Sequence, residues 1–568
     1  MIDTVVIVVF SVFIMLVGIS FSRTGRNLKS FFAGGEAVPW SIGGLSLFMS
    51  FFSAGTFVVW GSIAYQYGWV AITIQWTMCI GGLITGLYLA PKWKATGNLT
   101  AAEFIKDRLG AGVQKSFIYI FMLVSLFIKG SVLYSVSKLV GSSLDFPIIP
   151  VTIILGVLMI SYTAVGGLWA VMVTDILQFV ILTAAVLLII PLAFGETGGF
   201  DSFLSKMPSD FLDLKNGEYS WAFIFAFTLY HIFYIGGNWT FVQRYTSVDT
   251  PKSASKVAYL FAALYVISPV LWMLPPMIYR TINPGLTGLE TENAYLMVCK
   301  QVLPAGLMGL ILTGMYFSTS ASANTALNVV SAVYTNDIYK ATLNPHASDR
   351  KLMFVARASS WIFGFGMIII ALIVPYIGGI VEFTLTVGAL TGGPLLAPPL
   401  WSLFSKRLTG KATIWITLIS LTVNIFFKII LPLFSTKLSR GSEMLLGVLL
   451  PFGLLIAYEV YAAARGMVSK EYTELQIVRE KRKNAIVVVD EEEAQEVIRH
   501  NVFGLKVIAF SLAFISLLLY LLCLFTAKGT VMVAGIATVI LLCSFIPLSA
   551  SRRAVIKMKK FTVERNEL

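Results

Sequence analysis

The sequence predicts an all-α polytopic membrane protein, and three observations support this fold class. The chain has 568 residues, of which 57% are hydrophobic and 12% are charged, whereas soluble domains carry about 25% charged residues. The apolar residues gather in segments close to the roughly 20 residues that an α-helix needs to cross a bilayer. The largest polar segment, 464–502, is too short to form a sizeable soluble domain.

We expect about fifteen membrane-spanning helices, each apolar over most of its length and separated from the next by a short polar or glycine-containing connection. In chain order they are 2–22, 39–66, 69–91, 116–138, 148–166, 169–193, 221–240, 256–279, 304–334, 353–375, 380–402, 412–432, 443–463, 503–526 and 529–549. The first segment begins Met-Ile-Asp without a basic region or a clear cleavage site, so we expect a retained helix.

Charge placement predicts the orientation. With an external N-terminus and a cytoplasmic C-terminus, the loops that face the cytoplasm hold most of the 42 Lys and Arg residues. This asymmetry accounts for the net charge of +13 without a nucleic-acid partner. Basic segments such as 551–553 and 557–560 suit lipid head groups better. We therefore expect a multi-pass protein of the plasma (inner) membrane, with the lipid bilayer as its main partner.

Composition and motifs argue against an enzyme and against a transition-metal site. Four scattered cysteines and three histidines form no CxxC motif and no Cys/His cluster. The predicted spans contain no HExxH, GxSxG or phosphate-binding loop motif and no paired carboxylates. A membrane-embedded enzyme is therefore disfavoured.

The segment 316–339 combines the length of a spanning helix with many polar side chains. Ser318, Ser322 and Thr325 follow one helical stripe at i, i+4 and i+7, and Asn324 begins a second stripe. Such groups are costly at membrane depth unless a partner meets them. Hydroxyl and carbonyl oxygens suit hard cations. Close packing of small residues is the alternative explanation, but the number of polar residues favours a cation site.

Two predicted spans are interrupted by small residues in corresponding places. The second span carries Ser-Ala-Gly-Thr at 53–56, and the seventh carries Gly-Gly-Asn at 236–238. The two spans lie five apart, and since five is odd, a second five-helix unit would be inverted relative to the first. Interrupted helices in matching positions of inverted repeats indicate the midplane binding site of a transporter.

Asp175 stands within an otherwise apolar span. A carboxylate at this depth needs a cation or water. A Lys or Arg partner would satisfy it, although none is near in sequence, and a sodium ion is the natural alternative. Asp175 would otherwise be an interfacial residue that caps a helix start.

Several motifs together resemble the sodium/solute symporter family, which includes sodium-coupled sugar, sialic-acid, proline and vitamin transporters. They are Tyr162-Thr163, Gly166-Gly167, Ala170-Val171, Thr174-Asp175-x-x-Gln178, Ser53-Ala54-Gly55-Thr56-Phe57, Gln243-Arg244 and Thr335-Asn336-Asp337-Ile338-Tyr339. The matches run from about residue 30 to about 410. The resemblance implies a leucine-transporter-like fold of two inverted five-helix repeats and alternating access driven by sodium.

With this fold, the chain divides into six parts. They are an N-terminal peripheral helix (1–38), a first five-helix repeat (39–200), a second inverted repeat (201–410), peripheral helices (411–463), a charged cytoplasmic segment (464–502), and a C-terminal helix pair with a basic tail (503–568).

The resemblance implies one sodium site and suggests a second. In the family, carbonyls of the first core helix and a carbonyl and two hydroxyls of the eighth hold one ion. The matching residues here are Met49, Phe52, Ser318, Ala321 and Ser322. Ala321 departs from the Ser or Thr that many members carry. Some members have a second site, and its matching residues here are Asp175, Asn324 and Thr325.

The family's substrate contacts match Ser53, Thr56, Gln75 and Tyr234 by position, and Tyr234 falls where sugar transporters of the family have an aromatic gate. Lys129 lies mid-span, one residue after the position at which acid-transporting members carry a basic residue. A lysine that faces the cavity favours a carboxylated substrate, whereas one that snorkels to the interface carries no such meaning.

The function that these expectations favour is sodium-coupled symport, in which sodium is the coupling ion. The chain would import a small polar organic solute, a sugar or a sugar acid such as sialic acid. A sodium symporter for a monocarboxylate, an amino acid or an inorganic anion is the alternative within the same class. A transporter-like sensor is the alternative from a different class.

Overall fold

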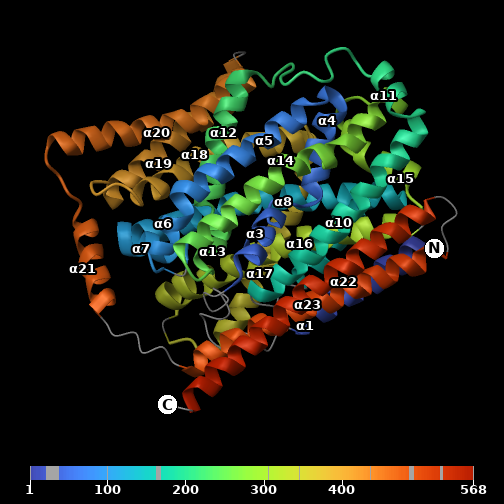
Figure 1. The fold of residues 1–568 in the computed structure, drawn as a ribbon. Helices are drawn as coiled ribbons and strands as arrows, with labels where there is room; N and C mark the ends of the chain where they lie inside the picture. Colours follow the sequence, from blue (N-terminus) through green and yellow to red (C-terminus); the bar gives the residue numbers. More distant parts are fainter. Residues whose placement is uncertain are drawn as a thin grey trace.

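The computed structural model describes residues 2–20, 38–98, 100–161, 168–304, 306–344, 346–434, 437–484, 491–524 and 529–566. Over these residues the chain is a bundle of helices and contains no β-strand (Figure 1). One isolated bridge pairs Asn216 with Tyr219 in a loop. The predicted all-α fold class is confirmed.

Ten of the fifteen predicted spans are confirmed as helices that could cross a membrane, and the other five correspond to shorter apolar helices. The described residues contain ten helices that are long and apolar enough to cross a membrane. They also contain five shorter apolar helices, namely Ile2–Val17, Trp40–Met49, Ile148–Ile160, Trp221–Gly237 and Leu307–Ser320. Each of the fifteen predicted spans overlaps one helix of these two groups.

The first predicted repeat starts with an interrupted helix. Its elements are α3 (Trp40–Met49), η2 (Thr56–Trp60), α4 (Gly61–Tyr67), α5 (Val70–Ile84), η3 (Thr85–Leu89), α6 (Ala90–Ala95), α7 (Ala101–Leu109), α8 (Ala111–Leu144), α9 (Ile148–Ser161) and α10 (Leu168–Thr197).

The second predicted repeat also starts with an interrupted helix after a connecting segment. Its elements are α11 (Phe200–Lys206), α12 (Trp221–Gly237), α13 (Trp239–Thr246), α14 (Pro251–Ile282), η4 (Gly288–Asn293), α15 (Ala294–Val302), α16 (Leu307–Val333), η5 (Tyr334–Leu343), α17 (Asp349–Ile373), η6 (Val374–Ile377) and α18 (Gly379–Ser402).

Peripheral elements flank this core. They are α1 (Ile2–Ser20), α19 (Gly410–Ile425), η7 (Phe426–Ile430), η8 (Leu431–Phe434), α20 (Arg440–Ala464), α21 (Lys470–Asn484), α22 (Glu491–Leu522) and α23 (Thr530–Asn566). Figure 1 shows α1, α22 and α23 side by side along one flank, where buried residues such as Phe10, Leu512 and Val533 join one apolar cluster with α10 and α16.

The break after α3 is stabilised by side chains that bond the backbone in place of helical hydrogen bonds. The hydroxyl of Thr56 donates to the carbonyl of Phe51 at 3.1 Å and accepts from the amide of Ser53 at 3.2 Å. The amide of Ala54 donates to the hydroxyl of Thr319 on α16 at 3.1 Å. Side chains therefore pair the amides of Ser53 and Ala54 and the carbonyl of Phe51, which the break leaves without helical partners.

The break between α12 and α13 has a different cause. Asn238 leaves the helical conformation, and its side-chain oxygen caps α13 by accepting from the amide of Thr240 at 3.0 Å. The preceding glycines allow close packing, because a Cβ on Gly236 would lie 2.2 Å from Leu89 and one on Gly237 would lie 3.0 Å from Leu400. The two interrupted helices thus coincide with the residues that the sequence singled out.

Candidate functional site

A cavity of about 340 Å³ lies at the two helix breaks. Its walls come from the segment between α3 and η2, from α8, from the start of α10, from the junction of α12 and α13, and from α16 and α18. The cavity therefore combines elements of both predicted repeats. Its volume lies in the range of small-molecule sites, which starts at about 300 Å³.

Two residues predicted to hold sodium meet at one edge of this cavity. The hydroxyl of Ser318 donates to the carbonyl oxygen of Phe52 at 2.8 Å, and both residues line the cavity. The carbonyl of Met49 accepts from the amide of Phe52 at 2.9 Å, and Met49 also lines the cavity. Three of the residues predicted to bind sodium therefore belong to one cavity wall, between α16 and the broken end of α3.

The remaining predicted sodium ligands lie on the same helix, α16. Ala321, Ser322, Asn324 and Thr325 belong to α16, but their side chains lie outside the described residues. The expected contribution of these four residues, including the effect of the departure at Ala321, stays a prediction.

Asp175 has protein partners that its sequence neighbourhood does not contain. Its carboxylate accepts from the hydroxyl of Ser46 at 2.7 Å and lies 3.9 Å from the guanidinium of Arg244. The side chains of Asp175 and Arg244 are 7% and 4% exposed, so the pair is buried. Since α10 starts at Leu168, Asp175 lies inside a helix, and the interpretation of a helix-capping residue is wrong.

Four of the five predicted substrate contacts line the cavity, namely Ser53, Thr56, Lys129 and Tyr234. The fifth, Gln75, is 2% exposed and is not among the lining residues. Its amide nitrogen lies 3.5 Å from the carbonyl of Ala71 on its own helix. Within this conformation the match at Gln75 therefore gives no contact with the cavity.

Tyr234 belongs to an aromatic wall. Its ring stacks on that of Tyr230, with ring centres 5.3 Å apart and planes at 17°. The rings of Phe51 and Phe241 meet Tyr234 edge-on at 5.7 Å and 5.4 Å. This packing holds the tyrosine ring at the cavity wall in one orientation.

His231 is a cavity residue that the sequence analysis missed. Its Nδ1 lies 2.6 Å from the hydroxyl of Thr77, which also donates to the carbonyl of Ile74 at 2.5 Å. Because a hydroxyl carries only one hydrogen, Nδ1–H must be the donor toward Thr77. In the neutral imidazole, Nε2 is then an acceptor. The only signal in the sequence was a polar residue in an otherwise apolar span, about one turn before Tyr234.

Among the described residues, no group of three or more His, Cys, Asp or Glu side chains is arranged to hold a metal ion. The cavity instead offers hydroxyl and carbonyl oxygens from α16 and α3, and these are donors that suit an alkali cation.

Comparisons with known proteins agree with this geometry. The sequence model of the sodium:solute symporter family matches residues 31–420. A sodium/glucose cotransporter of Vibrio parahaemolyticus is 27% identical over 465 residues, which cover 75% of this chain and 85% of the relative. The human sodium/iodide cotransporter is 27% identical over 402 residues, which cover 67% of this chain and 61% of the relative.

A solved structure is also similar. It is a substrate-bound, outward-open Na⁺-coupled sialic acid symporter, which covers 83% of this chain and 99% of its own with a TM-score of 0.67 and 20% identity. At this identity the likeness concerns the fold. The predicted leucine-transporter-like arrangement is confirmed.

Proposed function

This chain belongs to the sodium:solute symporter family and is a multi-pass membrane protein that couples solute transport to sodium, and we propose that its solute is a sugar or a sugar acid such as sialic acid. The observation that carries the proposal is that Phe52 and Ser318, which share a hydrogen bond, line the same cavity as Tyr234. One cavity can thus present a cation to one side of an organic solute.

We place the sodium ion between α3 and α16. The carbonyls of Met49, Phe52 and Ala321 and the hydroxyls of Ser318 and Ser322 would be its ligands. The Ser318 hydroxyl now donates to the Phe52 carbonyl at 2.8 Å. For both oxygens to face a cation, the hydroxyl hydrogen must turn away, so sodium competes with this hydrogen bond.

The same break links the ion to the solute. Phe52 is followed directly by Ser53, which lines the cavity together with Gly55 and Thr56. An ion that fixes the carbonyls of Met49 and Phe52 also fixes the direction of the Ser53 and Thr56 side chains. By reciprocity, a solute that binds the ordered break raises the affinity for sodium by the same factor. This mutual effect is the basis of coupling in alternating access.

The cavity chemistry favours an organic solute. Stacked tyrosines suit the face of a sugar ring, while His231, Ser53 and Thr56 offer the few orienting hydrogen bonds that such sites use. Sugars and sialic acid are also the solutes named for the bacterial relative and for the similar structure.

Lys129 favours an acid within this group. It lines the cavity at mid-helix on α8, and an ammonium group there attracts a carboxylate. The same observation supports the second candidate, a monocarboxylate or another organic anion. The solute named for the human relative is an inorganic anion, iodide, but the volume of about 340 Å³ suits an organic molecule better.

A second sodium ion at Asp175 would have to displace a protein cation. The guanidinium of Arg244 and the hydroxyl of Ser46 already contact that carboxylate. We therefore propose that Asp175 accepts sodium, together with Asn324 and Thr325, only in a conformation in which α13 has moved away from α10. In the conformation described here, Arg244 neutralises the charge.

We propose the plasma (inner) membrane as the location, with the N-terminus outside and the C-terminus in the cytoplasm. The support is the concentration of Lys and Arg in the loops that this orientation places in the cytoplasm. Import of the solute then follows the inward sodium gradient.

A ligand-dependent thermal-shift screen of the purified protein tests the solute. The panel contains hexoses, sialic acids, uronates and short carboxylates, each with sodium and with potassium. A sugar or sugar acid should raise the melting temperature, and only when sodium is present, because coupled ligands stabilise the folded state jointly. Stabilisation by a short carboxylate alone would favour the second candidate, and stabilisation by sugars regardless of the cation would contradict the proposal.

A further inference from the structure

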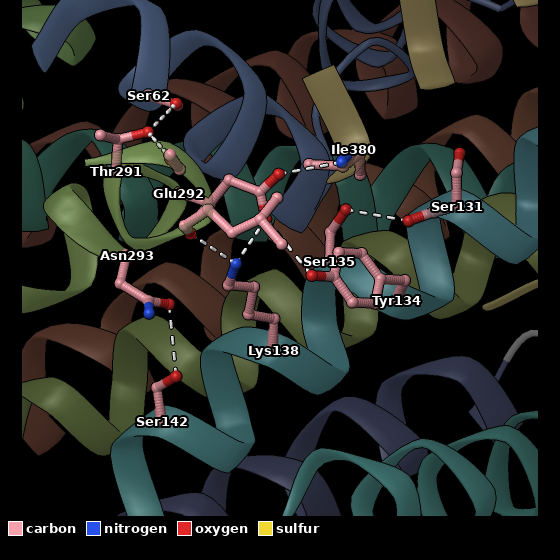
Figure 2. Close-up of polar contacts among 12 residues, drawn as sticks. Ser62, Ser131, Tyr134, Ser135, Lys138, Ser142, Thr291, Glu292, Asn293 and Ile380 are labelled. Atoms are coloured by element: carbon pink, nitrogen blue, oxygen red, sulfur yellow. Dashed lines mark hydrogen bonds and ion pairs between the residues drawn. The ribbon is translucent and has the colours of Figure 1, made fainter. Parts of the chain in front are cut away.

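A buried ion pair lies beside the cavity and outside the site described above. Glu292 is the penultimate residue of the short helix η4, and Lys138 lies near the end of α8. The Lys138 Nζ and the Glu292 Oε2 are 2.5 Å apart (Figure 2). Their side chains are 3% and 10% exposed. Removing two charges from water is expensive, so a buried pair by itself is weak evidence of a role in stability. Its position indicates another role.

The carboxylate of Glu292 joins three elements. Its Oε2 accepts from Lys138 and from the hydroxyl of Tyr134 at 3.3 Å, both on α8. Its Oε1 accepts from the backbone amide of Ile380, at the start of α18, at 2.9 Å. The neighbouring Thr291 shares a hydrogen bond of 2.7 Å with Ser62 on α4 (Figure 2). Thus η4 ties α4, α8 and α18 together at one end of the bundle.

The start of α18 is built closely around this carboxylate. Gly379 has a φ of +84°, and a Cβ placed on it would lie 2.3 Å from the Glu292 Oε1. Only glycine combines this backbone conformation with so close an approach. The amide of Ile380 can therefore reach the carboxylate, and α18 begins where Glu292 holds it.

This junction lies next to one end of the cavity. Along α8 the lining extends from Ile118 to Val132 and stops before Tyr134 and Lys138. Ile380, which donates its amide to Glu292, itself lines the cavity. The cavity thus extends toward the start of α8 but ends where η4 joins the three helices.

We propose that the Glu292–Lys138 pair is a latch that keeps the cavity closed at the η4 end, and that solute access from this end requires the pair to part. An ion pair suits this task because both charges regain hydration when they separate, whereas an apolar plug would expose its surface to water. The inference rests on the chain being a transporter and is independent of the solute and of sodium.

The native Cys299 reports on the latch. It lies on α15, which continues directly from η4, and it is 1% exposed. When η4 leaves its place, α15 must shift with it, and the thiol becomes accessible. Labelling of a buried thiol measures the fraction of molecules that are locally open.

The experiment compares the rate at which a water-soluble maleimide labels Cys299 in the full-length chain, with peptide mass spectrometry to separate the four cysteines. Glu292→Gln keeps the side-chain shape but leaves Lys138 without an opposite charge, and Lys138→Gln does the reverse. Each variant should raise the labelling rate of Cys299 by about tenfold or more, because a buried charge without its partner favours the open state.

Asp145→Asn is the matched control. Asp145 and Lys300 also join α8 to α15 at the same end, but at 3.6 Å and with the aspartate side chain 90% exposed. Asn tolerates the positive φ of 55° at this position. This variant should label like the parent protein. The latch is contradicted if both Gln variants label Cys299 at the parent rate, or if labelling of Cys79 on α5 rises by the same factor, since that would mean loosening of the whole bundle.

Discussion

The hydroxyl of Ser318 donates a hydrogen bond of 2.8 Å to the carbonyl oxygen of Phe52, and this bond joins α16 to the broken end of α3. Both residues line the cavity. A polar helix that is costly within a membrane thereby gains a partner in the other repeat. We propose that a sodium ion held between Ser318 and Phe52 would order the break, which also borders the proposed solute site.

Replacing Ser318 with Ala removes one proposed sodium ligand. We expect the sodium concentration for half-maximal uptake to rise about tenfold, since the loss of one such contact corresponds to roughly 1.4 kcal/mol. The solute concentration dependence at saturating sodium should change little. The measurement is initial uptake as a function of sodium.

Thr313→Val is the matched control for this substitution. Thr313 is a buried residue of α16 whose hydroxyl donates to the carbonyl of Gly309 within its own helix at 2.7 Å. Its sodium dependence should equal that of the parent. An equal shift in both variants would mean that any lost hydroxyl on α16 has this effect, which contradicts a ligand role for Ser318.

Asp175 and Arg244 should behave as one energetic unit. Removing either partner leaves a buried charge, which costs about 3–5 kcal/mol in comparable pairs. Asp175→Asn and Arg244→Met should each lower the melting temperature. The double variant should lose less than the sum of the two, because no unpaired charge remains. Additive losses in thermal unfolding would show that the pair carries no coupling.

Tyr234 should contribute its ring rather than its hydroxyl. We expect Tyr234→Ala to raise the KM for the solute about tenfold and Tyr234→Phe to leave it within about twofold, in keeping with the value of aromatic contacts. Phe225→Ala is the control on the same helix, because Phe225 is 56% exposed on the bundle surface and should not affect KM. An equal effect of Tyr234→Ala and Phe225→Ala would exclude a specific contact.

Lys129 distinguishes an acid from a neutral sugar. If the solute carries a carboxylate, Lys129→Met should reduce its uptake about tenfold or more, because a charged hydrogen bond contributes roughly 1.5–3 kcal/mol. Uptake of a neutral analogue of the same ring should be spared. Equal loss for both molecules in a competition assay would mean that Lys129 supports the helix and not the solute.

Local patterns in the sequence were sufficient to predict the helices and the two breaks. Apolar length marked the spans, and the residues at 53–56 and 236–238 marked the interruptions, since both signals lie within a few positions of one another. Ser318, the first residue of the predicted stripe, contacts the carbonyl of Phe52, and the roles of Ser322 and Thr325 stay predictions.

Local patterns could not predict contacts between residues that are distant in sequence. Neither the Asp175–Arg244 pair nor the Glu292–Lys138 pair could be predicted, because each joins residues that periodicity does not relate. Gln75 matched the family by position, but the rotation of α5 keeps it out of the cavity. Rotations and pairings of this kind depend on how the helices pack, which no single segment determines.

The most direct test of the central claim is solute uptake into proteoliposomes with an inward gradient of sodium, potassium or choline at equal membrane potential. The solute is the sugar or sugar acid that stabilises the protein in the thermal-shift screen. We predict concentrative uptake with sodium and no accumulation with potassium or choline, because in the proposed mechanism only sodium binds between Ser318 and Phe52 and thereby favours solute binding in the cavity. Equal uptake in all three salts would contradict sodium-coupled transport of that solute.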